Sequence, residues 1–192
     1  MSKKAVVLLA EGFEEVEAAT PIDYLRRAGV EVSVAATGEN LAVTGARGIT
    51  LQADSTLAGL AGQGKLDASC WDAVVIPGGI PGAPNLAASK ETGAFIAEMA
   101  GAGKLVCAIC ASPVVVLAPL GLISGKNFTC YPGMEKNISG GKWSQQPAVI
   151  DGNIITSRGP GTSGNFAIAI IEKLLGEAEA KKIAQAVLLQ EA

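Results

Sequence analysis

The chain has 192 residues, of which 49% are hydrophobic and 17% charged, and its formal net charge is −3. This length is sufficient for one domain with a full hydrophobic core, so we expect residues 1–192 to form a single domain. The aromatic content of 4% and the lack of a basic cluster argue against nucleic acid or an anionic membrane as a partner, and no segment is long enough to span a bilayer.

Short apolar runs alternate with segments of helical length along the chain. The runs are rich in β-branched residues, as is typical of parallel strands buried on both faces. We predict strands at residues 4–10, 30–36, 72–77 and 104–109, helices at 14–28, 90–100, 162–175 and 177–189, and β-hairpins at 40–52 and 148–157. This alternation predicts a doubly wound α/β sandwich with a mostly parallel central sheet.

The first strand has an alternative interpretation. Residues 1–18 begin with two lysines and an apolar run, as a signal peptide does, but the run is short and acidic residues follow it directly. A first core strand therefore fits better.

Two of the predicted elements carry boundary signals. The helix at 14–28 begins with acidic residues and ends before Gly29, a residue suited to a C-cap, while Pro21 inside it is expected to kink or loosen it. Asp151-Gly152 is a strong type I′ turn signal for the second hairpin.

The cysteine and histidine content limits the kinds of metal and catalytic site that the chain can form. Four cysteines occur in apolar surroundings without secretory features, which indicates reduced thiols and a cytoplasmic protein. There is no histidine, so the usual zinc sites and any Cys-His or Ser-His catalytic pair are excluded. We expect no metal site.

Three loops at residues 11–17, 77–82 and 110–113 each follow a predicted parallel strand. Because the carboxyl ends of such strands lie at one edge of the sheet, the loops are expected to meet there. The last loop holds Cys110, three residues after Cys107. Side chains three apart on a strand point to opposite faces, so a disulfide between these cysteines is geometrically poor, and we interpret Cys107 as a core thiol.

Cys110 lies where a strand passes into a helix, which is the position of a nucleophile elbow. Backbone N–H groups at the helix start are expected to stabilise its thiolate and lower its pKa. The local pattern fits a small buried cysteine at a tight turn equally well. The Gly78-Gly79 pair favours the reactive interpretation, because it permits close backbone approach and an N–H directed at an oxyanion.

Four motifs, AEGFEEVEA, VVIPGGIPGAPNL, AICASP and TSRGPGTS, together resemble the DJ-1/ThiJ/PfpI superfamily, in the branch of the parkinsonism-associated protein and the bacterial ThiJ-like proteins. The resemblance extends from the first strand to the helix after Thr162. It implies a flavodoxin-like sandwich, a homodimer and a reactive cysteine at the elbow.

By motif position, Cys110 matches the family nucleophile and Glu17 the acidic residue bonded to it. Gly79 and Ala111 match the backbone donors of the oxyanion pocket. Arg47 and Arg158 match arginines near the dimer-side entrance of the family site, and Tyr131 stands where many relatives have a histidine.

Other polar residues have plainer interpretations. Glu14 and Glu15 are expected to be solvated charges at a helix start. Cys70 and Cys130 are expected to be structural thiols. Arg158 could merely brace a turn, and packing alone could account for Tyr131.

The resemblance implies a cofactor-free glyoxalase or deglycase. Its substrate would be a small dicarbonyl such as methylglyoxal, or an adduct of it, converted to lactate by Cys110 with Glu17 moving protons. The alternative is a redox-responsive protective protein in which Cys110 oxidises to a sulfinate. The peptidase activity of more distant relatives is a weak third reading, because it pairs the cysteine with a histidine.

Overall fold

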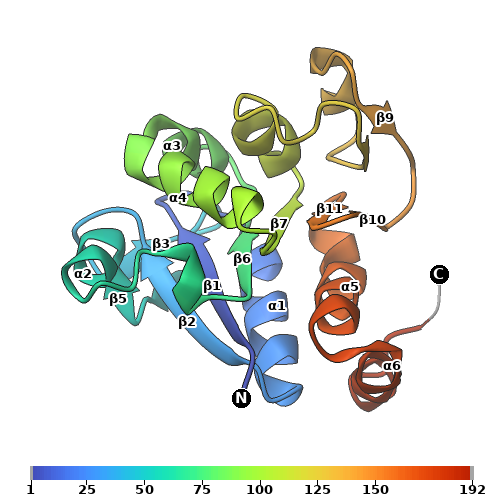
Figure 1. Cartoon of the computed structure of the whole chain (residues 1–192), viewed down its shortest axis with the longest axis horizontal. Coiled ribbons are helices and arrows are strands. Elements are labelled where there is room, and N and C mark those ends of the chain that lie inside the picture. The colour runs from blue at the N-terminus through green and yellow to red at the C-terminus, as the bar shows by residue number, and fades with distance from the viewer. Residues whose placement is uncertain (1, 191–192) are drawn as a thin grey trace.

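The computed structural model describes residues 2–190, and its centre is a seven-stranded sheet (Figure 1). The strands of this sheet are β1 (Lys4–Leu9), β2 (Glu31–Ala36), β5 (Ser55–Thr56), β6 (Ala73–Ile76), β7 (Leu105–Ile109), β10 (Ala148–Asp151) and β11 (Ile154–Ser157). Their order is β10-β11-β7-β6-β1-β2-β5, and all neighbours are parallel except β10 and β11. The five central strands, taken in chain order, follow the 2-1-3-4-5 arrangement of flavodoxin-like folds, so the predicted fold class is confirmed.

Helices cover both faces of the sheet. α1 (Glu15–Arg27), α5 (Ser163–Leu175) and α6 (Glu177–Ala186) lie on one side, and α3 (Gly82–Ala88) and α4 (Lys90–Gly101) on the other (Figure 1). α2 (Leu57–Gly62) follows the short edge strand β5. Outside the main sheet, β3 (Ala42–Thr44) pairs with β4 (Thr50–Gln52), and β8 (Asn127–Phe128) with β9 (Lys142–Trp143).

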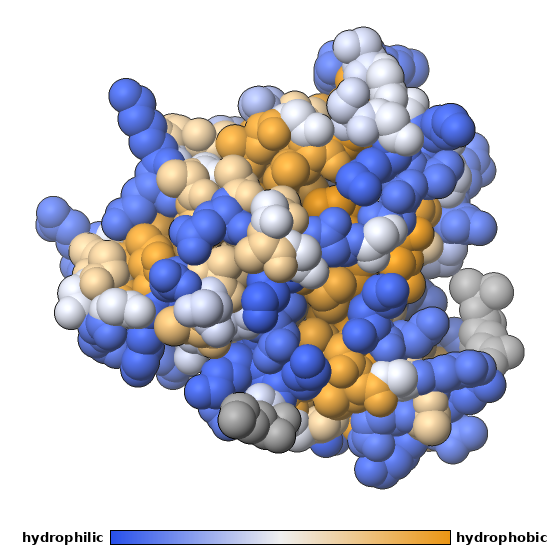
Figure 2. Space-filling view, in the orientation of Figure 1, coloured by the Kyte–Doolittle hydropathy of each residue, from blue (hydrophilic) through white to orange (hydrophobic). Residues whose placement is uncertain are grey.

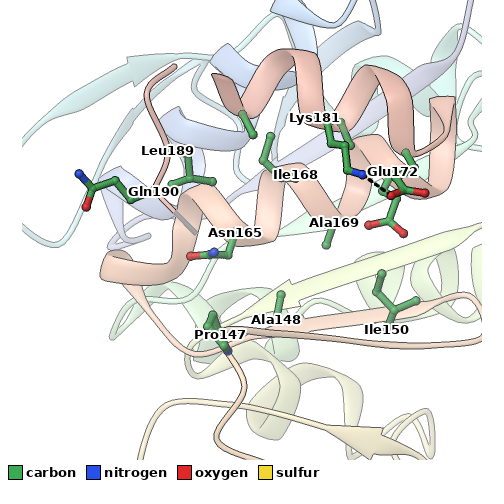
Figure 3. A pocket seen from close by; sticks show the side chains of 13 residues that line it. Pro147, Ala148, Ile150, Asn165, Ile168, Ala169, Glu172, Lys181, Leu189 and Gln190 are labelled. Atoms are coloured by element: carbon green, nitrogen blue, oxygen red, sulfur yellow. Dashed lines mark ion pairs between the residues drawn. The ribbon is translucent and has the colours of Figure 1, made fainter. Parts of the chain in front are cut away.

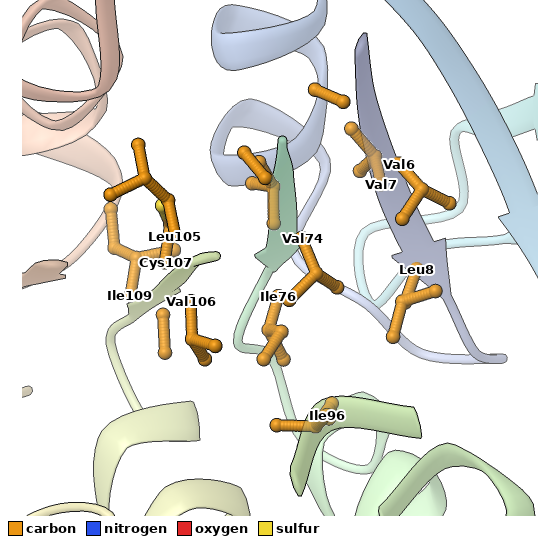
Figure 4. Close-up of a cluster of buried hydrophobic side chains, with 14 of the residues drawn as sticks. Val6, Val7, Leu8, Val74, Ile76, Ile96, Leu105, Val106, Cys107 and Ile109 are labelled. Atoms are coloured by element: carbon orange, nitrogen blue, oxygen red, sulfur yellow. The ribbon is translucent and has the colours of Figure 1, made fainter. Parts of the chain in front are cut away.

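The core lies along β1, β6 and β7. Val6, Val74 and Val106 occupy one row of the parallel ladder, and each is fully buried. Ile96 of α4 packs toward this cluster from one face (Figure 4). Because helices cover both faces, these strands need apolar side chains at consecutive positions rather than alternate ones. Burial of each such side chain contributes roughly 1.5–3 kcal/mol.

Most of the predicted elements are present within one to three residues of their expected ends. Both hairpins form, and Gly152 has a φ of +65° at the second turn. Gly29 has a φ of +78° just after α1, as expected for a residue past a helix end. Pro21 is buried within α1, which runs unbroken from Glu15 to Arg27. The sequence prediction missed α2, α3, β5, β8 and β9, which are all short.

No helix within residues 2–190 combines the length and the apolar composition needed to cross a membrane.

Candidate functional site

The three loops expected to meet do lie together at the carboxyl ends of β1, β6 and β7, and hydrogen bonds join them. The Glu14 N–H donates to the carbonyl oxygen of Gly78 at 3.1 Å. The Ser112 hydroxyl donates to the carbonyl oxygen of Pro77 at 2.6 Å, and this bond is buried. The loop after β6 is therefore fixed to both of its neighbours.

Cys110 occupies the turn between β7 and the single π-helical turn Pro113–Leu117. Its φ of +64° lies in the left-handed region, which costs a non-glycine residue on the order of 1–3 kcal/mol. Two main-chain bonds hold it there: its N–H donates to Ser157 at 3.0 Å, and its carbonyl accepts from the Tyr131 N–H at 2.8 Å. Cys110 is 9% exposed, so only one edge of it reaches solvent.

Glu17 extends from α1 into the buried space beside Cys110 and has no exposed surface. The Gly78 N–H donates to its Oε2 at 2.8 Å, while its Oε1 is buried without a hydrogen-bond partner. Burial raises the pKa of Glu17 to about 7, although the bond from Gly78 and the neighbouring Cys110 thiol act in the opposite direction. A carboxyl with this pKa can hold or release a proton near neutral pH.

The expectation that the elbow lowers the pKa of Cys110 is wrong, because that pKa is raised. Burial and the adjacent Glu17 charge raise the pKa of Cys110, and they outweigh the backbone N–H groups of Gly79 and Ala111, which lower it. When Glu17 holds the proton instead, its repulsion is removed, while both backbone donors still stabilise the thiolate. The pair therefore shares a proton, and its titration belongs to both groups.

Close backbone packing makes this arrangement possible. A Cβ on Gly78 would lie 2.7 Å from the Cβ of Cys110 and 2.8 Å from Oε2 of Glu17. Gly79 has a φ of +92°, and a Cβ on it would lie 2.5–2.7 Å from backbone atoms of residues 12–14. Only glycine at these two positions brings the N–H of residue 79 to the sulfur.

A pocket of about 500 Å³ opens above Cys110. Its walls include Gly79, Ala111, Arg47 and Tyr131, so five of the predicted site residues meet there when Cys110 is counted. Glu17 lies beneath Cys110 rather than in the wall. Tyr131 is 50% exposed, with its side chain at the rim.

Arg158 does not line this pocket. It lies in a neighbouring depression of about 220 Å³, and its Nη1 donates to the carbonyl of Gln145 at 3.2 Å. Its main chain also braces a turn, because the Arg158 N–H donates to the Thr162 hydroxyl at 3.2 Å.

The solvated role expected for Glu15 is wrong, since its side chain is only 4% exposed. Oε1 of Glu15 accepts hydrogen bonds from the N–H groups of Arg47 at 2.6 Å and Ile49 at 3.3 Å. Glu15 thus fixes the β3–β4 turn that carries Arg47 into the pocket wall. Glu14 instead caps α1, accepting from the Glu17 N–H at 2.8 Å. The sequence carried no signal for the link to Arg47, because it depends on a contact across 32 residues.

The cysteines are all unpaired. Cys107 and Cys130 are fully buried, and burial raises the pKa of both thiols. Cys70 is half-buried, with its Sγ 3.8 Å from the carbonyl oxygen of Gly64. Within residues 2–190, no group of three or more His, Cys, Asp and Glu side chains could hold a metal ion.

A second large groove, of about 490 Å³, lies between α5, α6 and the edge strand β10 (Figure 3). It is lined largely by apolar side chains such as Ile168 and Leu189, and contains none of the predicted site residues. Figure 2 shows that apolar side chains also form a broken band across this view of the molecular surface.

Comparison with known proteins places the chain in a family. The model of the DJ-1/PfpI family matches residues 3–173. Protein DJ-1 homolog B of Arabidopsis thaliana is 39% identical over 96% of the chain, which spans 41% of that longer protein. Glutathione-independent glyoxalase DJR-1.2 of Caenorhabditis elegans is 34% identical over 91% of this chain and 90% of its own length.

A solved structure agrees with this assignment. Oxidized DJ-1 of Toxoplasma gondii superposes with a TM-score of 0.92 and 35% sequence identity, covering 99% of this chain and all of that one. The family match, the sequence identity and the fold all agree, and the chain therefore belongs to the DJ-1/PfpI family.

Proposed function

We propose that this protein is a cysteine-dependent glyoxalase or deglycase that converts methylglyoxal, or an adduct of it, to lactate without a cofactor. One observation carries the proposal: a thiol at a strained elbow, a buried carboxyl with a pKa of about 7 and two backbone N–H donors converge at the base of one pocket. A relative of similar length is a glutathione-independent glyoxalase, which supports this choice.

The first step is addition of the Cys110 thiolate to the aldehyde carbon, which moves the carbonyl electrons onto oxygen. The N–H groups of Gly79 and Ala111, which bond to sulfur in the resting site, are the donors available to this developing alkoxide. Protonation of the alkoxide gives a hemithioacetal.

The second step moves hydrogen between adjacent carbons. Glu17 removes the C–H proton from the former aldehyde carbon, giving an enediol, and returns a proton to the neighbouring carbon. The product is a thioester of lactate, in which the first carbon is oxidised and the second reduced. Water then cleaves the thioester, releasing lactate and the Cys110 thiol. The sum is methylglyoxal plus water giving lactate, so no outside oxidant is consumed.

Lactate formation by purified protein tests the proposal. Wild-type protein should form many equivalents of lactate per chain, while Cys110→Ser should form none above the uncatalysed rate. A wild-type protein that forms no lactate would overturn the glyoxalase assignment. Comparison of free methylglyoxal with a methylglyoxal-treated peptide then separates dicarbonyl scavenging from deglycation.

The redox-responsive alternative rests on the same pair, because a protonated Glu17 could donate a hydrogen bond to a Cys110 sulfinate. It predicts oxidation of Cys110 by two equivalents of peroxide, through the sulfenic acid to the sulfinate, without product turnover. Lactate in excess over protein favours the enzyme.

We also propose that the protein is a cytoplasmic homodimer. Two large apolar side chains, Val16 and Ile49, are 47% and 58% exposed near the elements that carry the site. Light scattering after size-exclusion chromatography should give twice the chain mass of 19.3 kDa. A single-chain mass would contradict the proposed dimer.

A further inference from the structure

The depression around Arg158 adjoins the Cys110 pocket. The two hollows share Tyr131 and Pro160 in their walls. A Cβ on Gly159 would lie 3.5 Å from Cδ2 of Tyr131 and 3.9 Å from Oε1 of Glu17, so this glycine lies between the catalytic carboxyl and the tyrosine ring. The Tyr131 side chain therefore lies between the Cys110 pocket and the Arg158 depression.

Arg158 is also close to Cys110 along the backbone. Ser157, the preceding residue, pairs with Ile109 in the β11–β7 ladder and accepts the hydrogen bond from Cys110. Adjacent strands are about 4.8 Å apart. The Arg158 side chain thus starts roughly one strand spacing from the nucleophile, within reach of a substrate a few carbons longer than methylglyoxal.

The Arg158 guanidinium has no counter-ion among residues 2–190. Its Nε is buried and has no hydrogen-bond partner, and Nη1 donates to the neutral carbonyl of Gln145. Glu135 raises the pKa of the Cys130 thiol whereas Arg158 lowers it, and the Glu135 carboxylate accepts a hydrogen bond from the Gly133 N–H at 2.7 Å. Among residues 2–190, Arg158 takes part in no ion pair within 4.0 Å. A partly buried cation without an anion is costly unless a ligand supplies one.

The loop that carries Arg158 is rigidly held. The Thr162 hydroxyl accepts from the N–H groups of Arg158 at 3.2 Å and Gly159 at 3.1 Å, and lies 2.8 Å from the Ser157 hydroxyl. Arg158 is the charged residue among those that line the depression. The site is therefore positioned before a ligand arrives, which reduces the ordering cost of binding.

We propose that the Arg158 depression is a second substrate subsite, and that it selects 2-oxoaldehydes whose far end carries a carboxylate. The idea rests on the proposed function and defines its substrate class. A suitable substrate is 4,5-dioxopentanoate, whose aldehyde reaches Cys110 while its carboxylate passes Tyr131 to Arg158. Addition, hydrogen shift and hydrolysis then convert it, with one water, to 2-hydroxyglutarate.

The test compares 4,5-dioxopentanoate with 2-oxopentanal, which has the same chain length and a methyl group in place of the carboxylate. Wild-type protein should show a kcat/KM about tenfold higher for the acid, as expected for a charged hydrogen bond. Arg158→Met should abolish that preference. Lys136→Met is the matched control, since it removes an exposed positive charge nearby that lines neither hollow, and it should keep the preference.

Equal kcat/KM for the two substrates in wild-type protein would overturn the subsite, as would a preference that survives in Arg158→Met. If the preference were lost equally in Lys136→Met, the general surface charge would be its cause and the subsite would again be wrong.

A second measurement does not depend on turnover. 2-Hydroxyglutarate should protect Cys110 from iodoacetamide more strongly than 2-hydroxypentanoate does, and Arg158→Met should remove the difference. Protection of this kind without lactate formation from methylglyoxal would retain the subsite and reject the proposed enzyme. Equal protection by both acids, together with normal methylglyoxal turnover, would reject the subsite and retain the proposed enzyme.

Discussion

The buried hydroxyl of Ser112 and the carbonyl of Pro77 are joined by a 2.6 Å hydrogen bond. This contact ties the turn that carries Ala111 to the loop that carries Gly79, and both of those residues direct an N–H at the Cys110 sulfur. The spacing between the two backbone donors therefore depends on a side chain that never touches the pocket.

Ser112→Ala should weaken both stability and catalysis. The variant leaves a buried carbonyl oxygen without its donor, which costs on the order of 1–3 kcal/mol. Urea denaturation should show this loss, and kcat for methylglyoxal should fall more than KM rises, because the donors act mainly on the alkoxide. A stable variant with unchanged kcat would show that the donors are held by other contacts.

Glu17 should make the protein less stable as the pH rises. Its pKa is about 7 in the folded protein against 4.5 for the free side chain, so the folded state binds the proton more tightly than the unfolded state does. The contribution is complete below pH 4.5, falls between 4.5 and 7, and then stays constant, for a total of about 3 kcal/mol.

Glu17→Gln removes that dependence. Thermal unfolding followed across this pH range should show a downward slope in wild-type protein and a flatter line in the variant. Parallel lines would mean that Glu17 has an ordinary pKa.

The pH dependence of Cys110 alkylation should show that Cys110 and Glu17 titrate as a pair. We expect limiting iodoacetamide to modify Cys110 before the other cysteines, as peptide mapping would show. Its rate should rise as the pair loses its first proton near pH 7 and then level off, because one proton remains distributed between Glu17 and Cys110. In Glu17→Gln the step near pH 7 should disappear. Preferential modification of Cys70 or Cys130 would contradict the assignment of the nucleophile.

Gly78→Ala should disrupt the site directly. The added methyl group would lie 2.7 Å from the Cβ of Cys110, too close for either residue to remain in place. We expect a stability loss of roughly 1–3 kcal/mol and loss of lactate formation. Gly62→Ala is the control, because nothing lies within 4 Å of its added Cβ and it closes helix α2, so its stability should be unchanged or slightly higher.

Substitutions at Tyr131 test whether the lack of a histidine at this position limits the rate of catalysis. A phenol is a poorer base than an imidazole at neutral pH, and general-base assistance is worth roughly 10²–10⁴-fold. We therefore expect modest methylglyoxal turnover in wild-type protein and a faster rate or altered pH profile in Tyr131→His. If Tyr131→Phe were inactive while Tyr131→His was unchanged, the hydroxyl itself would be a required donor.

The sequence was sufficient to predict the fold because its buried strands are encoded locally. Runs such as KAVVLLA and KLVCAI are apolar at consecutive positions, and Gly29 and the Asp151-Gly152 turn carry their own conformational signals. Short elements such as β8 and β9 were missed, since two-residue strands have no period to detect.

The site was only partly predictable, for a different physical reason. Motif resemblance indicated most of the residues that meet, although Arg158 lines the neighbouring depression instead. The pKa of Cys110 depends on its own burial and on the adjacent Glu17 charge, which are tertiary properties. The same holds for Glu15, which looks like a surface charge until the β3–β4 turn donates two backbone N–H groups to it.

The backbone donors at Gly79 and Ala111 have a consequence for mutagenesis. Their N–H groups belong to the main chain, so no side-chain replacement except proline removes them, and alanine replacements at the other pocket residues would leave the proposed alkoxide donors in place. Such a scan would assign nearly all of the activity to Cys110 and Glu17. Replacing the amide with an ester at residue 79 or 111 by semisynthesis is the substitution that deletes a single donor and measures its contribution.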